Sequence, residues 1–186
     1  MKKKIAEQLG IWVQVSEFSP SNPAIAIGRD IRQLATHPTN DGVLIQLPFY
    51  DYLFKQTQDI IEYLPYKKDV DGLTATQQGL SMHLIEGSFP PAVVEAIIEA
   101  LNYCFNEDLT WESIISDTDK KSFEGKKVLI VNNTTLIGRP LASILSALNA
   151  TVTSANHTTK EVKALMRQAD IVVVGTNQTN MFSSED

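Results

Sequence analysis

The chain has 186 residues, of which 43% are hydrophobic and 20% are charged, and its formal net charge at pH 7 is −6. This length can bury one large core or two small ones. The acidic balance gives no electrostatic reason to expect a nucleic-acid partner or a phospholipid surface. The single cysteine, Cys104, excludes an intramolecular disulfide and fits a reducing compartment. Because no apolar run matches a membrane span or a signal peptide, we expect a cytoplasmic protein.

The first half of the chain mixes helical and strand patterns. IWVQV at 11–15 predicts a strand because it is rich in β-branched and aromatic residues. VLIQL at 43–47 predicts another, which Pro48 ends because proline has no N–H to donate. The helices expected here, in chain order, lie at 2–9, from Ser21 onward, at 52–63 and at 91–104.

The second half has a more regular pattern. Residues 106–124 are rich in acidic residues and turn formers, so we interpret them as a linker. The elements expected after them are strands at 127–131, 150–155 and 170–174, and helices at 141–148 and 160–169. Continuous β-branched strands between helices predict a parallel sheet covered on both faces, as in half of a Rossmann-like fold. We therefore expect an α/β protein with an N-terminal domain at 1–105 and a partial, truncated Rossmann-like domain at 125–186.

Four features could carry chemistry, and each alone has an ordinary structural explanation. KDVDG at 68–72 joins a lysine and two carboxylates in a glycine-containing loop, which is usually just a surface turn. Gln46 is an amide in an apolar strand, where a buried amide needs partners. The lysines at 2–4 are most simply a solvated helix end. The loop at 132–140, NNTTLIGRP, could hold a phosphate at the next helix, although its single glycine does not match GxGxxG.

The order and spacing of the motifs are more specific than any one of them. DGVLIQLP, KDVDG, GKKVLIV, IGRPLA, ATVTSA and ADIVVV follow one another between residue 2 and about residue 176. This series resembles the bifunctional methylenetetrahydrofolate dehydrogenase/cyclohydrolase family. The resemblance implies oxidation of 5,10-methylenetetrahydrofolate with NADP and hydrolysis of 5,10-methenyltetrahydrofolate to 10-formyltetrahydrofolate. It also implies tetrahydrofolate as the substrate carrier and a homodimer.

The resemblance implies a set of folate-site residues. Counting back from Gly10 places the family's catalytic lysine on Lys2, whereas the tyrosine of its Tyr-x-x-x-Lys motif falls before the first residue. Gln46 matches the glutamine of the family's Val-Gln-Leu-Pro strand, and Asp71 matches the aspartate that binds the pterin. Pro91, the first residue of the family's Pro-Cys-Thr-Pro, adds a substrate contact. A carboxylate can accept two parallel N–H bonds from a 2-aminopyrimidinone edge, and a lysine amine oriented by an amide can relay protons.

The implied nucleotide contacts depart from the family pattern. They are Asn132, Asn133, Thr134, Gly138, Arg139 and Asn156. The family's Gly-Arg-Ser is Asn-Asn-Thr at 132–134, so the arginine that would meet a 2′-phosphate is absent, although Arg139 lies nearby. The closing Pro-Gly-Gly stretch is missing, which indicates an incomplete copy. We therefore expect this chain to bind a reduced folate more readily than a nicotinamide dinucleotide.

Three functions compete for this sequence. The first is the family enzyme, with hydrolysis as the activity that survives. The second is a degenerate, non-catalytic paralogue that retains at most folate binding or dimerisation. The third is another two-domain Rossmann dehydrogenase, which has only fold-level analogy in its favour and is opposed by DGVLIQLP together with KDVDG. In each case we expect no metal site.

Overall fold

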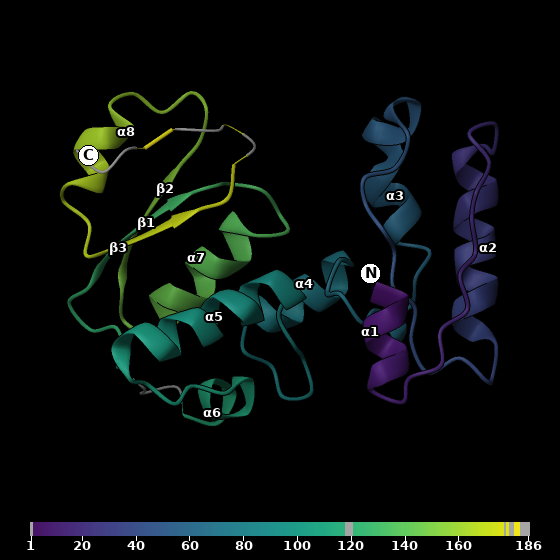
Figure 1. Cartoon of the computed structure of the whole chain (residues 1–186), viewed down its shortest axis with the longest axis horizontal. Helices are drawn as coiled ribbons and strands as arrows, with labels where there is room; N and C mark the ends of the chain where they lie inside the picture. The colour runs from purple at the N-terminus through teal and green to yellow at the C-terminus, as the bar shows by residue number, and fades with distance from the viewer. Residues whose placement is uncertain (1, 118–120, 177, 179–180, 183–186) are drawn as a thin grey trace.

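The computed structural model describes residues 2–117, 121–176, 178 and 181–182, which form two lobes (Figure 1). The helices are α1 Lys2–Gln8, α2 Ala24–Thr36, α3 Thr57–Ile61, α4 Ala75–Met82, α5 Ala92–Phe105, α6 Trp111–Ser116, α7 Gly138–Ala147 and α8 Val162–Met166, with 3₁₀ helices η1 Asp51–Gln56 and η2 Tyr66–Lys68. The strands are β1 Lys127–Val131, β2 Thr151–Ala155 and β3 Ile171–Val174. Within the described ranges, no helix combines the length and the apolarity needed to cross a membrane.

The second lobe is built on a three-stranded parallel sheet with the order β2-β1-β3, so the α/β fold is confirmed (Figure 1). Val128 of β1 pairs with Val152 on one side and with Ile171 on the other. Side chains alternate along a strand, so Val128 and Ile130 share a core with α7, whereas Leu129 shares a core with α8. Both faces of β1 are therefore covered, as the continuous apolar strand predicts.

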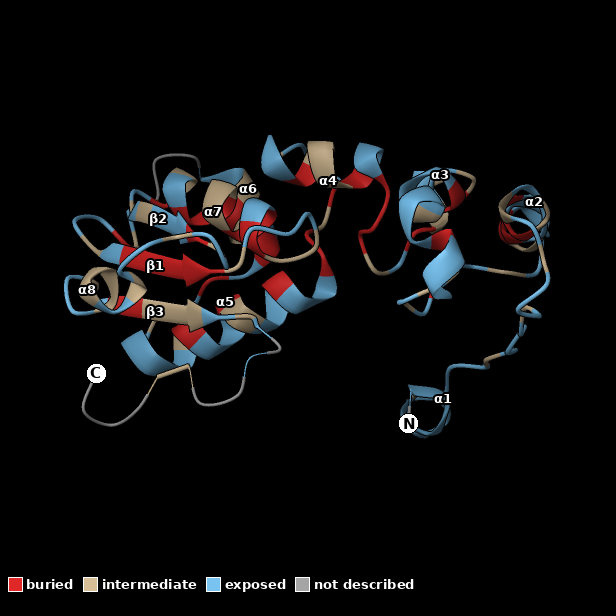
Figure 2. Ribbon diagram, turned by 90° about the horizontal axis from the view of Figure 1, so that it is seen from above, coloured by how far each residue is buried: buried red, intermediate tan, exposed pale blue. Residues whose placement is uncertain are grey.

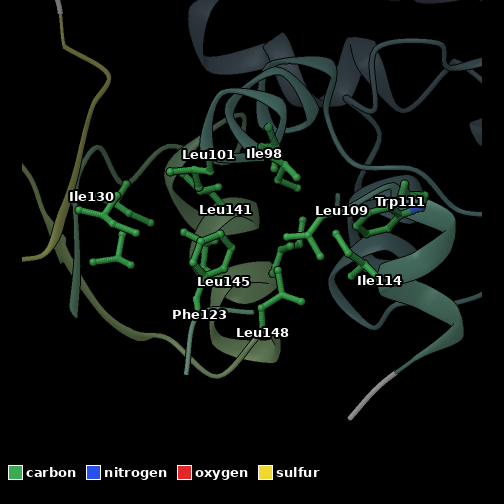
Figure 3. Packing of buried hydrophobic residues seen from close by; sticks show 14 residues of the cluster. Ile98, Leu101, Leu109, Trp111, Ile114, Phe123, Ile130, Leu141, Leu145 and Leu148 are labelled. Atoms are coloured by element: carbon green, nitrogen blue, oxygen red, sulfur yellow. The ribbon is translucent and has the colours of Figure 1, made fainter. Parts of the chain in front are cut away.

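The larger core joins three helices to one face of this sheet. It includes Ile98 and Leu101 of α5, Trp111 and Ile114 of α6, and Leu141, Ile144 and Leu145 of α7 (Figure 3). Within the predicted linker, residues 111–116 form α6, which presents two apolar residues, three positions apart, to the core. The domain division stays a prediction, and this packing favours a boundary before α5.

The first lobe has a smaller core of its own. Helix α2 contributes Ile27, Ile31 and Ala35, and helix α3 contributes Ile60 and Ile61. The other buried members are Ile45, Leu53, Leu64 and Leu73. Helix α1 buries no residue, and Figure 2 shows it standing apart on an extended segment. Within the described part of the chain, residues 12–17 of that segment form no hydrogen bond, and Trp12 is 77% exposed.

Two strands predicted for this lobe are wrong. The stretch IWVQV at 11–15 has no paired neighbour, and in VLIQL only Val43 pairs, through an isolated parallel bridge to Asp69. A strand needs a partner as well as a suitable composition, and composition does not supply the partner. Gln46 is consequently exposed rather than buried inside a strand. Cys104, although it lies on the apolar helix α5, is also exposed.

Candidate functional site

The KDVDG loop is held in place by its first aspartate. Asp69 is buried, and its carboxylate accepts the backbone N–H of Thr74 at 2.7 Å and that of Asp71 at 3.4 Å. The loop is also fastened to the preceding apolar segment, because Val43 donates its N–H to the carbonyl of Lys68 at 2.7 Å. Asp69 therefore organises the loop, a role that the sequence did not reveal.

The second aspartate of the loop faces outward, toward the N-terminal helix. The carboxylate of Asp71 lies 4.0 Å from the Nζ of Lys2, and the two side chains are 27% and 56% exposed. An ion pair this exposed contributes little to stability. Its significance is positional, because it brings together two residues that the family resemblance assigned to one site.

Pro91 lies against the same loop. Gly72 has a φ of +67°, and a Cβ at this position would lie 2.9 Å from both the N and the Cα of Pro91. Only glycine combines this left-handed conformation with so close an approach. The structure thus places Pro91 beside Asp71, in agreement with their predicted shared role as substrate contacts, although no bound substrate tests that role.

Gln46 does not reach the other folate-site residues. Its Nε2 donates to the carbonyl of Leu47 at 2.8 Å, next to the cis peptide Leu47–Pro48. Among the described residues, no hydrogen bond joins Gln46 to Lys2 or Asp71. The orienting contact that we expected between this amide and the lysine is therefore not formed in the structure.

The candidate nucleotide loop follows β1 and closes on itself. The Oδ1 of Asn132 accepts from the backbone N–H and the hydroxyl of Thr134, both at 2.8 Å, and from the N–H of Gly138 at 3.0 Å. The Nδ2 of Asn132 donates to the carbonyl of Gly175 at 2.6 Å. One carboxamide therefore binds the start of α7 and the residue after β3.

The remaining predicted nucleotide contacts are also satisfied locally. The Nε of Arg139 donates to the carbonyl of Asn133 at 3.1 Å. At the end of β2, the Oδ1 of Asn156 accepts from the N–H and the hydroxyl of Thr158, at 2.8 Å and 2.6 Å. These bonds hold each loop together from within.

The two candidate loops meet at the junction of the lobes. Leu136, in the loop after β1, packs against the core of the first lobe, which also contains Leu73 from the segment just after KDVDG. The hydroxyl of Ser143 in α7 donates to the carbonyl of Met82 at the end of α4, at 3.3 Å. A leucine in a polar loop is a weak sequence signal, and Leu136 was not singled out for that reason.

A hollow of about 570 Å³ lies elsewhere, between segment 12–18 and α2. Its lining residues include Trp12, Phe18 and His37 but none of Lys2, Gln46 or Asp71. Among the described residues, no group of three or more histidines, cysteines or carboxylates is arranged to hold a metal ion. The geometry thus leaves the KDVDG loop as the candidate site.

The second lobe defines a Rossmann-like nucleotide-binding domain, and its sequence agrees. Residues 112–186 match the model of the tetrahydrofolate dehydrogenase/cyclohydrolase NAD(P)-binding domain. The chain is 30% identical over 184 residues to the bifunctional protein FolD of Bacillus velezensis, covering 99% of this chain and 59% of that protein. The chain is thus similar along nearly its whole length to proteins named as bifunctional FolD, and the resemblance seen in its motifs is confirmed.

Solved structures give the same result. The crystal structure of FolD from Campylobacter jejuni matches with a TM-score of 0.81 and 27% identity, over 99% of this chain and 59% of that one. The bifunctional enzyme from Thermoplasma acidophilum matches with a TM-score of 0.76 and 27% identity, over 99% of this chain and 60% of that one. The chain therefore spans about 59% of the length of the relatives it matches.

Proposed function

We propose that this chain binds reduced one-carbon folates at the KDVDG loop and that any activity is hydrolysis of 5,10-methenyltetrahydrofolate to 10-formyltetrahydrofolate. The observation that carries the proposal is the outward-facing carboxylate of Asp71, held beside Pro91 and 4.0 Å from the amine of Lys2. The relatives are named as dehydrogenases and cyclohydrolases acting on these folates. Of the two reactions, hydrolysis is the one that needs no dinucleotide.

Each residue of the candidate site has a distinct role in the proposed binding and hydrolysis. Asp71 accepts two N–H bonds from the 2-aminopyrimidinone edge of the pterin, a pairing that fixes its orientation. Lys2 stands beside that anchor and moves a proton as water adds to the methenyl carbon and the ring carbon–nitrogen bond opens. Gly72 and Pro91 hold the anchor at a fixed position relative to α5.

The same geometry supports a second candidate, which is folate binding without catalysis. The side chain of Lys2 is 56% exposed, and Gln46 hydrogen-bonds to its own neighbour instead of orienting the lysine. A proton relay needs a positioned amine, whereas binding through Asp71 does not. We also propose a homodimer in the cytoplasm, on the strength of the family resemblance alone.

Calorimetric titration with tetrahydrofolate tests the binding site. We expect the Asp71→Asn variant to bind at least about tenfold more weakly, because an amide cannot accept both N–H bonds, and tenfold corresponds to about 1.4 kcal/mol. Asp41→Asn, the same change at an exposed aspartate before the loop, is the control and should bind as the parent does. Equal affinity in both variants, or NADP binding without folate binding, would contradict the proposal.

A further inference from the structure

The match to an NAD(P)-binding domain raises the question of where a dinucleotide would bind. In an open parallel sheet, the ligand occupies the crevice at the carboxyl ends of the strands, where the chain reverses its direction of winding. Here β1 is central, β2 lies on one side and β3 on the other, so the crevice falls between the ends of β1 and β3. The phosphates would need free N–H groups in the first turn of α7.

Those N–H groups already have partners. The N–H of Gly138 donates to the Oδ1 of Asn132 at 3.0 Å, and the N–H of Arg139 donates to the carbonyl of Thr134 at 3.0 Å. Pro140 has no N–H to offer. In the loop, the N–H of Thr134 also donates to Asn132, at 2.8 Å, and the N–H of Ile137 donates to the hydroxyl of Thr134 at 3.3 Å. Within the described residues, the first turn of α7 thus presents no free backbone N–H to a phosphate.

The space between the strand ends is filled by the same side chain. The Nδ2 of Asn132 bonds to the carbonyl of Gly175, and a Cβ on Gly175 would lie 3.1 Å from that nitrogen. A Cβ on Gly138 would lie 2.0 Å from the carbonyl oxygen of Asn132, so the backbones are also in close contact. The residues present therefore do not fit a bound pyrophosphate, although the domain is of the nucleotide-binding type.

We propose that Asn132 closes the nucleotide crevice and determines that this chain does not bind NADP. Its carboxamide oxygen takes the hydrogen bonds that a phosphate oxygen would take, and its nitrogen ties the end of β1 to the end of β3. A carboxamide that makes four such hydrogen bonds cannot be displaced without leaving several donors unpaired, which is costly. This inference concerns the second lobe and stands independently of the folate site.

Replacing Asn132 tests the inference directly. Wild-type protein, Asn132→Ala and Asn132→Gly are each titrated with NADP by calorimetry, with Gln168→Ala as the control at an exposed amide outside the nucleotide loop. We expect no saturable binding at millimolar NADP for the wild type and the control. We expect at least about tenfold tighter binding for the Asn132 variants, since each freed N–H can bond a charged oxygen. NADP affinities that are the same with and without Asn132 would overturn the inference.

Hydrogen exchange on the wild-type protein is a second test, and its result does not depend on how the variants fold. The amides of Thr134 and Gly138 should exchange slowly without any ligand, and adding NADP should not change their rates. Slower exchange of these amides when NADP is added would show that the crevice opens, and the inference would then be wrong. Titrating tetrahydrofolate into the same proteins keeps the two sites apart, because loss of Asn132 should leave folate binding unchanged.

Discussion

Replacing Ile114 by alanine tests whether the segment between the predicted domains belongs to a core. Its side chain is 1% exposed and shares the core with Trp111 and Phe123, which are 8% and 1% exposed. Removing a fully buried isoleucine side chain and leaving a cavity costs about 2–5 kcal/mol. That is a large fraction of the roughly 5–15 kcal/mol by which a domain is usually stable. A surface linker would show almost no loss.

Urea unfolding followed by tryptophan fluorescence measures this effect. The chain has two tryptophans, and only Trp111 is buried, so the signal reports on the second lobe because Trp12 is already 77% exposed. The control is Ile25→Ala, the same change at a residue that is 48% exposed on α2. We expect the control to lose less than about 1 kcal/mol, since alanine also favours the helix. Losses below about 1 kcal/mol in both variants would refute the reasoning.

Two further predictions concern the folate loop. Lys2→Met should lower any hydrolysis by about a hundredfold or more, measured as loss of methenyl absorbance, whereas Lys3→Met should leave the rate unchanged. Hydrolysis that does not depend on Lys2, or clear NADPH formation, would contradict this prediction. Gly72→Ala should destabilise the protein by more than about 1 kcal/mol in urea, because its φ is +67° and its Cβ would meet Pro91. Gly79→Ala, in the open on α4, should instead stabilise by about 0.5–1 kcal/mol, and the same sign in both variants would count against the loop geometry.

The sequence predicted the second lobe well because its central strand, β1, is buried on both faces and apolar runs mark the strands. Runs such as KVLIV and DIVVV are apolar after their first residue, and the observed strands differ from the predicted ones by one residue at most at each end. In the first lobe, IWVQV and VLIQL have a similar composition but no strand beside them. Strand formation depends on a neighbour that may lie far away along the chain, and a local pattern does not contain that information.

Local sequence patterns also failed to predict helix α6 and to distinguish the two aspartates of the candidate site. Helix α6 was missed because acidic and turn-forming residues surround it, although Thr110 and Ser113 form a capping box at its start. The two aspartates of KDVDG are equivalent as a pattern, and only the family resemblance singled out Asp71. The structure explains the difference, because Asp69 is buried by its bridge to Val43 and only the second carboxylate remains open.

The KDVDG loop and the loop after β1 are organised in the same way, but they differ in the polar groups that they leave available to a ligand. In each, one acceptor side chain holds the backbone: the carboxylate of Asp69 in the first loop and the carboxamide of Asn132 in the second. After Asp69 has made its bonds, the loop still presents the charged carboxylate of Asp71. After Asn132 has made its bonds, the first turn of α7 retains no free backbone N–H among the described residues. A polar ligand needs groups that the fold leaves unsatisfied, and we therefore propose that binding takes place at the first loop, although the second lobe has the nucleotide-binding fold.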